Sequence, residues 1–168
     1  QRQMCIRDSA RTAGVEIGGI AHPFTKDNIE EGYKSLRLLE PQKMKDRLNE
    51  VSMPNWYHCI DESLRQAGMT RKDIGYLDVL HMKRSGHKGM LAELGLTEEQ
   101  SIYLEDYGHV GQIDQILSLE LALKAGKVKD GTVVCMIAAG IGYVWSANII
   151  KWGNTVSYTH LTLPTNRE

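Results

Sequence analysis

An apolar run at residues 132–139, Thr-Val-Val-Cys-Met-Ile-Ala-Ala, constrains the fold more than any other stretch of the chain. A strand with one face in water alternates polar and apolar residues, whereas an unbroken apolar run is typical of a strand buried on both faces. Such a strand requires neighbouring strands and a layer of helices on each side of the sheet. The run therefore predicts a layered α/β domain in which Cys135 is an inert, buried thiol.

The rest of the chain supplies the other elements of such a sheet. Apolar residues recur at helical spacing from Pro41 to Gly68, and Pro54 either interrupts this helix or starts a second one. The tight connection at residues 140–142 makes the last two strands antiparallel neighbours. The elements expected after residue 68 are a strand at 76–80, a helix carrying Met90, Leu91, Leu94 and Leu96, a short strand at 102–104, a strongly apolar and centrally buried helix at 113–125, and strands at 132–139 and 143–151.

The region before Pro41 gives weaker signals. Residues 15–20 are a strand candidate, and residues 28–39 are predicted to be a polar surface segment. On the helix that follows, Cys59 is expected to be a small buried residue with a structural role.

The composition argues against several classes of protein. With 42% hydrophobic and 24% charged residues and a formal net charge of −1, the chain fits one compact soluble domain with no nucleic-acid partner. Its apolar runs are far shorter than the ~20 residues of a membrane helix, and no apolar leader opens the sequence. The three cysteines are too widely spaced to suggest a disulfide framework or a zinc cluster. We therefore expect a cytoplasmic protein that binds no membrane.

The two ends of the chain are related at the level of DNA. One short DNA sequence can encode Met-Cys-Ile-Arg-Asp at residues 4–8, and its reverse complement then encodes Val-Ser-Tyr-Thr-His at residues 156–160. This inverted pair resembles an adaptor used in sequencing libraries. We therefore expect residues 1–9 and 155–168 to be adaptor-derived tails, and residues 10–154 to be one domain that is an internal fragment of a longer gene.

Two histidines stand just past predicted strands, where open α/β sheets place their ligands. His81 follows the strand at 76–80, and His109 lies in a later, glycine-flanked loop. We expect both to share one active site, although a histidine at a strand end can also be purely structural. The start of the helix after His81, with Lys83 and Arg84, favours a phosphate or carboxylate unless it is an ordinary solvated basic face.

Four segments, taken in order, resemble one family. They are Asp-Val-Leu-His at 78–81, Tyr-Gly-His at 107–109, Gly-Lys-Val-Lys-Asp-Gly at 126–131 and Ala-Gly-Ile-Gly-Tyr-Val-Trp at 139–145. Over about residues 43–152 the chain is similar to the carboxyl-terminal half of beta-ketoacyl-acyl-carrier-protein synthase III, in the thiolase-like superfamily. The resemblance implies an α/β, thiolase-like half with a mixed, five-stranded type of sheet covered by helices. It also implies a five-layer fold of two such halves, and a homodimer when the protein is full length.

The resemblance also implies an activity, that of an acyltransferase that forms carbon–carbon bonds in fatty acid biosynthesis. In this family a cysteine takes an acyl group from a thioester of acyl carrier protein or coenzyme A, without a further cofactor. The acyl group then joins a carbanion made by decarboxylating a malonyl thioester, and hydrogen-bond donors stabilise the enolate. His81 and His109 match the positions of these donors, and Gly140, Ile141 and Gly142 match the backbone loop of the oxyanion hole.

The chain departs from the family at three places. His109 stands where synthase III enzymes have asparagine, so that two histidines would act as in synthases of types I and II, with a changed pH dependence. Arg84 stands where a site-lining asparagine is expected, and with Lys83 it is a candidate contact for the carrier or its phosphate. Ile141 replaces the middle glycine of the closing loop and can keep its N–H donor only at negative φ.

Several alternatives remain open. The resemblance implies a nucleophilic cysteine in the amino-terminal half of the protein, and neither Cys59 nor Cys135 stands where its motif would be, so the chain alone is expected to be inactive. A related condensing enzyme such as a hydroxymethylglutaryl-CoA synthase, or a non-catalytic partner subunit, would share these motifs. A zinc site made of His81, His87 and His109 lacks any compact ligand spacing, so we expect no metal and place His87 on the helix surface.

Overall fold

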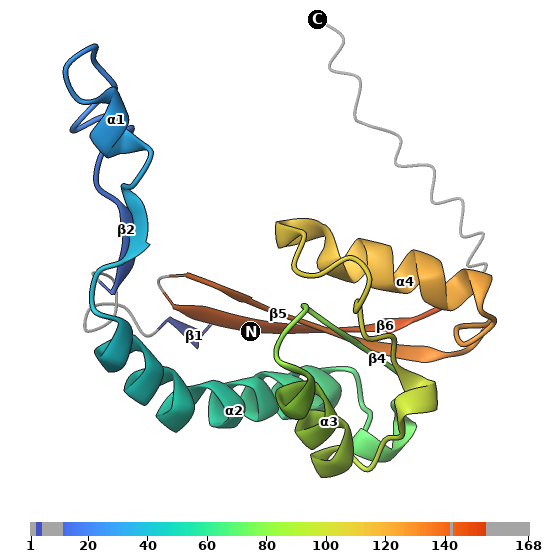
Figure 1. Ribbon diagram of the computed structural model, residues 1–168. Helices are drawn as coiled ribbons and strands as arrows, with labels where there is room; N and C mark the ends of the chain where they lie inside the picture. Colours follow the sequence, from blue (N-terminus) through green and yellow to red (C-terminus); the bar gives the residue numbers. More distant parts are fainter. Residues whose placement is uncertain (1–2, 5–11, 142, 154–168) are drawn as a thin grey trace, which may run out of the picture.

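A four-stranded mixed sheet forms the centre of the computed structural model, which describes residues 3–4, 12–141 and 143–153 (Figure 1). The strands lie in the order β1, β6, β5, β4, and β2 and β3 form a separate antiparallel pair. The elements are β1 (Gln3–Met4), β2 (Ala13–Val15), α1 (Ile29–Gly32), β3 (Leu36–Leu38), α2 (Pro41–Gln66), η1 (Arg71–Asp73), β4 (Tyr76–Val79), α3 (Arg84–Glu93), η2 (Glu98–Gln100), η3 (Gly111–Ile113), α4 (Asp114–Lys124), β5 (Val133–Gly140) and β6 (Val144–Lys151).

Helices cover both faces of this sheet. Figure 1 shows α2 and α3 on one side and α4 on the other, with the β2–β3 pair and α1 extending away from the sheet. β1 belongs to the predicted adaptor tail, yet it pairs antiparallel with β6. The remaining tail residues, 1–2, 5–9 and 155–168, lie outside the described residues. The division of the chain at residues 10 and 154 therefore stays a prediction.

β5 is the inner strand that organises the sheet. It runs parallel to β4, with Leu77 opposite Cys135, and antiparallel to β6, with Ala139 opposite Trp145. Cys135 is fully buried, and this burial raises the pKa of its thiol to about 12. The predicted buried strand, its unreactive thiol and the antiparallel final pair are confirmed. The mixed α/β sheet is confirmed as well. Among the described residues this sheet has four strands, against the five-stranded type that the resemblance implies.

Helix α2 continues without a break through Pro54, so neither predicted effect of this proline occurs. A proline costs a helix one backbone hydrogen bond. Packing outweighs that loss, because α2 lies along β6 and its Trp56 indole N–H donates to the Ala138 carbonyl of β5 at 3.1 Å. As predicted, the helix ends just before Gly68, which has a φ of +68°. The buried residues of α2 are Trp56, Cys59, Ile60 and Leu64.

Helix α4 buries both polar and apolar residues and leaves isoleucines exposed. Its buried residues are Asp114, Gln115, Ser118, Leu119 and Ala122, whereas Ile113, just before the helix, and Ile116 are 58% and 60% exposed. The prediction of a centrally buried helix is therefore wrong for the chain as it stands. Among the described residues, none of the helices combines the length and apolar character that crossing a membrane requires.

Two strand predictions are also wrong. Residues 102–104 form no strand, and only Ser101 makes a bridge to Leu77 of β4. The Ser101 hydroxyl donates to the Leu77 carbonyl at 2.8 Å, so a side chain attaches this segment to β4 in place of a backbone ladder. The strand predicted at 15–20 is β2, which ends at Val15. The chain then bends, and Gly18 adopts a φ of +110° that extended backbone cannot contain.

Asp78 is a carboxylic acid in the middle of the buried strand β4. It is fully buried, and neither of its side-chain oxygens has a hydrogen-bond partner among the described residues. Burial raises the pKa of Asp78 to about 7, although the nearby Ser118 acts in the opposite direction. The Asp78 carboxyl therefore ionises near neutral pH in the folded chain.

We expect Asp78→Asn to stabilise the fold more at pH 8 than at pH 5. Below about pH 4 the carboxyl is neutral in both states, but between about pH 4 and 7 it ionises more readily in the unfolded chain, which favours unfolding. The gain in the free energy of unfolding, measured with urea, should be about 2 kcal/mol larger at pH 8. The exposed Asp130→Asn is the matched control and should show no such difference. An Asp78→Asn effect that is the same at both pH values would contradict the raised pKa.

Candidate active site

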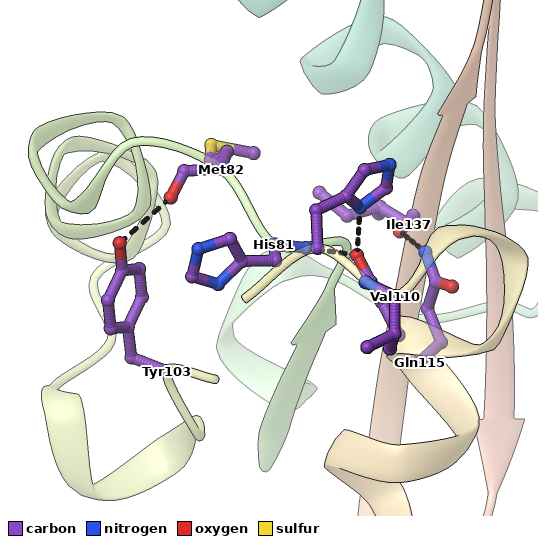
Figure 2. Close-up of polar contacts among 8 residues, drawn as sticks. His81, Met82, Tyr103, Val110, Gln115 and Ile137 are labelled. Carbon is purple, nitrogen blue, oxygen red and sulfur yellow. Dashed lines mark hydrogen bonds and ion pairs between the residues drawn. The ribbon is translucent and has the colours of Figure 1, made fainter. Parts of the chain in front are cut away.

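The carboxylate of Asp114 joins the loop after β4 to the loop before α4 (Figure 2). One carboxylate oxygen, Oδ2, accepts the backbone N–H of His81 at 2.7 Å and lies 2.6 Å from Nδ1 of His109. The other oxygen, Oδ1, accepts the backbone N–H of Val110 at 2.8 Å. The two histidines that we predicted to share one site are therefore linked through one carboxylate.

Asp114 is fully buried at the first position of α4 and still carries a negative charge. Burial acts to raise its pKa, but the hydrogen bonds from His109, His81 and Val110 outweigh this effect and lower the pKa below its ordinary value. The amino-terminal end of a helix also favours an anion. Asp114 thus places a fixed negative charge next to Nδ1 of the exposed His109 ring.

Two glycines let the His109 loop close onto this carboxylate. Gly108 and Gly111 have φ values of +69° and +79°, which side chains other than glycine adopt only with strain. The turns at these glycines bracket His109 and Val110, so that the ring of the first and the N–H of the second both reach Asp114. The glycine-flanked loop recognised in the sequence is therefore needed for the geometry of the site.

The ring of His81 is held by an aromatic neighbour. It lies against Tyr103, with the ring centroids 4.9 Å apart, and the Tyr103 hydroxyl donates to the Met82 carbonyl at 3.1 Å (Figure 2). Nδ1 of His81 is buried and has no hydrogen-bond partner within the described part of the chain. The backbone of His81 is thus fixed by Asp114, and its side chain is fixed by packing.

A pocket of about 420 Å³ lies beside His109, at the carboxyl ends of the parallel strands β4 and β5. Leu80 and Gln115 line it together with the end of β5. The Gln115 amide donates to the Ile137 carbonyl at 2.8 Å, which fixes its orientation (Figure 2). This is the edge at which open α/β sheets bind ligands.

The predicted oxyanion loop borders the same pocket. Gly140 and Ile141 line it, and Ile141 is 76% exposed. Every residue with positive φ in the described ranges is a glycine, so Ile141 meets the condition under which it can keep its N–H donor. Gly142 lies outside the described residues. The loop's role stays a prediction.

Lys83 and Arg84 are not among the described residues that line this pocket. The guanidinium of Arg84 is 4.4 Å from the centroid of the Tyr103 ring and forms an ion pair with Glu105, while Lys83 is exposed just before α3. The prediction that His87 lies on the helix surface is wrong. His87 is 4% exposed because its ring packs edge-on against Tyr103 at 5.4 Å, and this burial lowers its pKa.

Neither described cysteine lies in the site. Cys59 is buried on α2 with Sγ 3.6 Å from the Trp145 carbonyl oxygen, and Cys135 is buried inside β5. Within residues 3–4, 12–141 and 143–153, no three His, Cys, Asp or Glu side chains are grouped so that they could hold a metal ion. The described site therefore offers hydrogen bonds and charge, but no accessible thiol.

A mixed sheet with helices on both faces, His81 just past β4 and His109 at the pocket on the same edge fit a thiolase-like α/β domain. The crystal structure of beta-ketoacyl-[acyl carrier protein] synthase III from Thermus thermophilus has the same fold. It superposes with a TM-score of 0.68 at 19% sequence identity, over 91% of this chain and 45% of that one.

The sequence assigns the chain more narrowly. A family described as "3-Oxoacyl-[acyl-carrier-protein (ACP)] synthase III C terminal" matches residues 64–152, which is more than half of the chain. The chain belongs to this family.

Two curated relatives agree with this assignment. A beta-ketoacyl-[acyl-carrier-protein] synthase III from Microcystis aeruginosa is 33% identical over 129 residues, which are 75% of this chain and 37% of the relative. The enzyme of the same name from Symbiobacterium thermophilum is 24% identical over 140 residues, which are 81% of this chain and 40% of the relative. The chain thus spans about two fifths of the length of these relatives.

Sequence reasoning missed Asp114, the residue that connects the two histidines. Its signal was available, because an acidic residue five positions after His109 opens the apolar helix. An acidic residue in that place usually only stabilises the amino-terminal end of the helix. Only the folded loop shows that it also accepts N–H groups from His81 and Val110.

We expect Asp114→Ala to lower the free energy of unfolding by about 2–4 kcal/mol. The change leaves the N–H groups of His81 and Val110 without their acceptor, and each loss of this kind costs about 1–3 kcal/mol. The control is Asp106→Ala, an exposed residue of the same loop, which should stay within about 0.5 kcal/mol of the wild type. Urea denaturation measures both, and two equally small losses would show that Asp114 does not hold the loops together.

Proposed function

We propose that the chain is part of an acyltransferase of the beta-ketoacyl-[acyl-carrier-protein] synthase III type. The whole protein would condense acyl thioesters of acyl carrier protein or coenzyme A in fatty acid biosynthesis, and the chain would supply the groups that stabilise the enolate. The observation that carries this proposal is that Asp114 brings the loops of His81 and His109 together at a pocket on the carboxyl edge of the sheet. The family and the named relatives supply the reaction class.

The proposed roles follow from the geometry. Decarboxylation breaks the bond between the carboxylate and the α-carbon of a malonyl thioester, CO₂ leaves, and the electron pair forms an enolate whose oxygen needs hydrogen-bond donors. The candidate donors are His109, which lines the pocket, and His81, whose ring packs against Tyr103 beside the same loops. The backbone at Gly140 and Ile141, with Gly142, is the candidate donor loop for the acyl thioester that the carbanion attacks.

The cysteine nucleophile of this proposal lies outside the described residues, in the other half of the whole protein. The apolar outer face of α4 supports such a second half. Ile113 and Ile116 are more than half exposed, while the inner face of the helix buries polar side chains. A face of this kind is unfavourable in water and is typical of a surface that another part of a protein covers. We further propose that the whole protein is a cytoplasmic homodimer. The exposed Lys83 is the candidate contact for the carrier or its phosphate, together with Arg84, which also pairs with Glu105.

In the full-length protein, we expect His81→Ala to reduce decarboxylation of a malonyl thioester by about 100-fold or more, because one donor to the enolate oxygen is lost. The control is His58→Ala, an exposed position on α2, which should keep the wild-type rate. Release of labelled CO₂ measures the rate. Unchanged decarboxylation in His81→Ala would remove His81 from the mechanism and would favour the partner-subunit alternative.

The 168-residue chain by itself should show no acyl transfer. The thiols of Cys59 and Cys135 are buried away from the pocket, so neither can attack a thioester there. Mixing the purified chain with a radiolabelled acyl-CoA and separating the protein tests this. A stoichiometric acyl group on Cys59 or Cys135 would contradict the assignment of the nucleophile to the other half.

A further inference from the structure

The contact between His109 and Asp114 determines where His109 carries its proton. Asp114 keeps its charge, because the hydrogen bonds that it accepts lower its pKa, and an ionised carboxylate can only accept hydrogen bonds. The 2.6 Å contact with Nδ1 of His109 therefore requires a proton on that nitrogen. A neutral histidine has only one ring N–H, so Nε2 of a neutral His109 is bare.

The other ring nitrogen is the one available to a ligand. The side chain of His109 is 57% exposed and lines the pocket, while its Nδ1 edge is turned to the buried carboxylate. Nε2 lies across the ring from that contact, on the side open to solvent and the pocket. A bare Nε2 presents a lone pair, which repels an enolate oxygen, whereas a protonated Nε2 donates a hydrogen bond to it.

We propose that Asp114 is a positioning residue that makes His109 act as an imidazolium, with Nδ1–H donated to Asp114 and Nε2–H directed at the substrate oxygen. This inference rests on the proposed function for the identity of that oxygen, but not for the position of the proton. It also accounts for a buried aspartate next to the histidine that replaces the family's asparagine. A neutral amide needs no counter-charge, whereas an imidazolium over a buried carboxylate is a compensated ion pair.

Among the described residues, the contact with Asp114 is the main electrostatic contact of His109. From α4 it faces Asp114, and from the loop after β4 only the backbone N–H of His81 joins the same carboxylate. The other residues that line the pocket, on the loops and on β5, are uncharged. On the His109 loop itself, Glu105 is neutralised by Arg84 and Asp106 is exposed.

The proton position can be read without any activity. In the 168-residue chain with ¹⁵N-labelled histidine, NMR above pH 8 should show His109 with a protonated Nδ1 and a bare Nε2, with His109→Asn identifying the signal. Asp114→Asn can donate an amide N–H to Nδ1, so its His109 should carry the proton on Nε2 instead. A wild-type His109 that is already protonated on Nε2 in its neutral form would overturn the proposal.

The second readout is the pH profile of malonyl thioester decarboxylation by the full-length protein. As the pH rises, the wild-type rate of decarboxylation should fall when the His109 imidazolium loses its Nε2 proton. His109→Asn should be slower but flat over that range, because an amide donates at every pH. Asp114→Asn should lose the alkaline fall, because its neutral His109 carries the proton on Nε2 and can still donate it to the substrate oxygen; the control Asp106→Asn should keep the wild-type profile.

The possible outcomes separate the two claims. An alkaline fall that persists unchanged in His109→Asn would overturn the imidazolium role. A full-length protein with no decarboxylase activity at all would contradict the proposed function, while the NMR result would still decide where Asp114 places the proton.

Discussion

The buried carboxylate of Asp114 is the interaction on which the candidate site depends. Three groups from two loops, the backbone N–H of His81, the ring of His109 and the backbone N–H of Val110, meet at this one carboxylate. The hydrogen bonds that satisfy this buried charge also position the side chains of the candidate site around it. The two glycines with positive φ make it possible, since they let the His109 loop turn back onto the start of α4.

The polarity of α4 is the second feature that sets this chain apart from an ordinary small domain. The buried side of α4 holds Asp114, Gln115 and Ser118 beside Leu119 and Ala122, whereas Ile116 is exposed. In a self-contained domain the polar side chains of a helix are expected on its outer side. The arrangement makes sense if α4 lies between two layers, with its buried polar residues serving the site and its exposed isoleucine covered by a further layer of the whole protein. The match to about two fifths of the length of its relatives agrees with this picture.

Residues that depart from the family's pattern are accommodated by local structure. Ile141 keeps a φ that is compatible with a β-branched side chain, so the loss of a glycine does not by itself remove the backbone donor. Arg84 is neutralised by Glu105 and covered by Tyr103, which keeps its charge away from the pocket. Nδ1 of His109 lies 2.6 Å from the Asp114 carboxylate. Arg84 and His109 thus each have an acidic partner, whereas Ile141 depends on its own backbone conformation.

The sequence by itself determined the elements whose burial is continuous or strictly periodic. The unbroken apolar run of β5, the antiparallel final pair, the end of α2 at Gly68 and the histidine-bearing loops follow from local patterns, and the order of motifs identified the family. Tertiary structure alone decided the continuity of α2 through Pro54, the absence of a strand at 102–104, the burial of His87 and the meeting of His81 with His109 at Asp114. The reason is physical. These outcomes depend on hydrogen bonds and ring contacts between residues far apart in the chain, whose partners no local pattern of polarity can name.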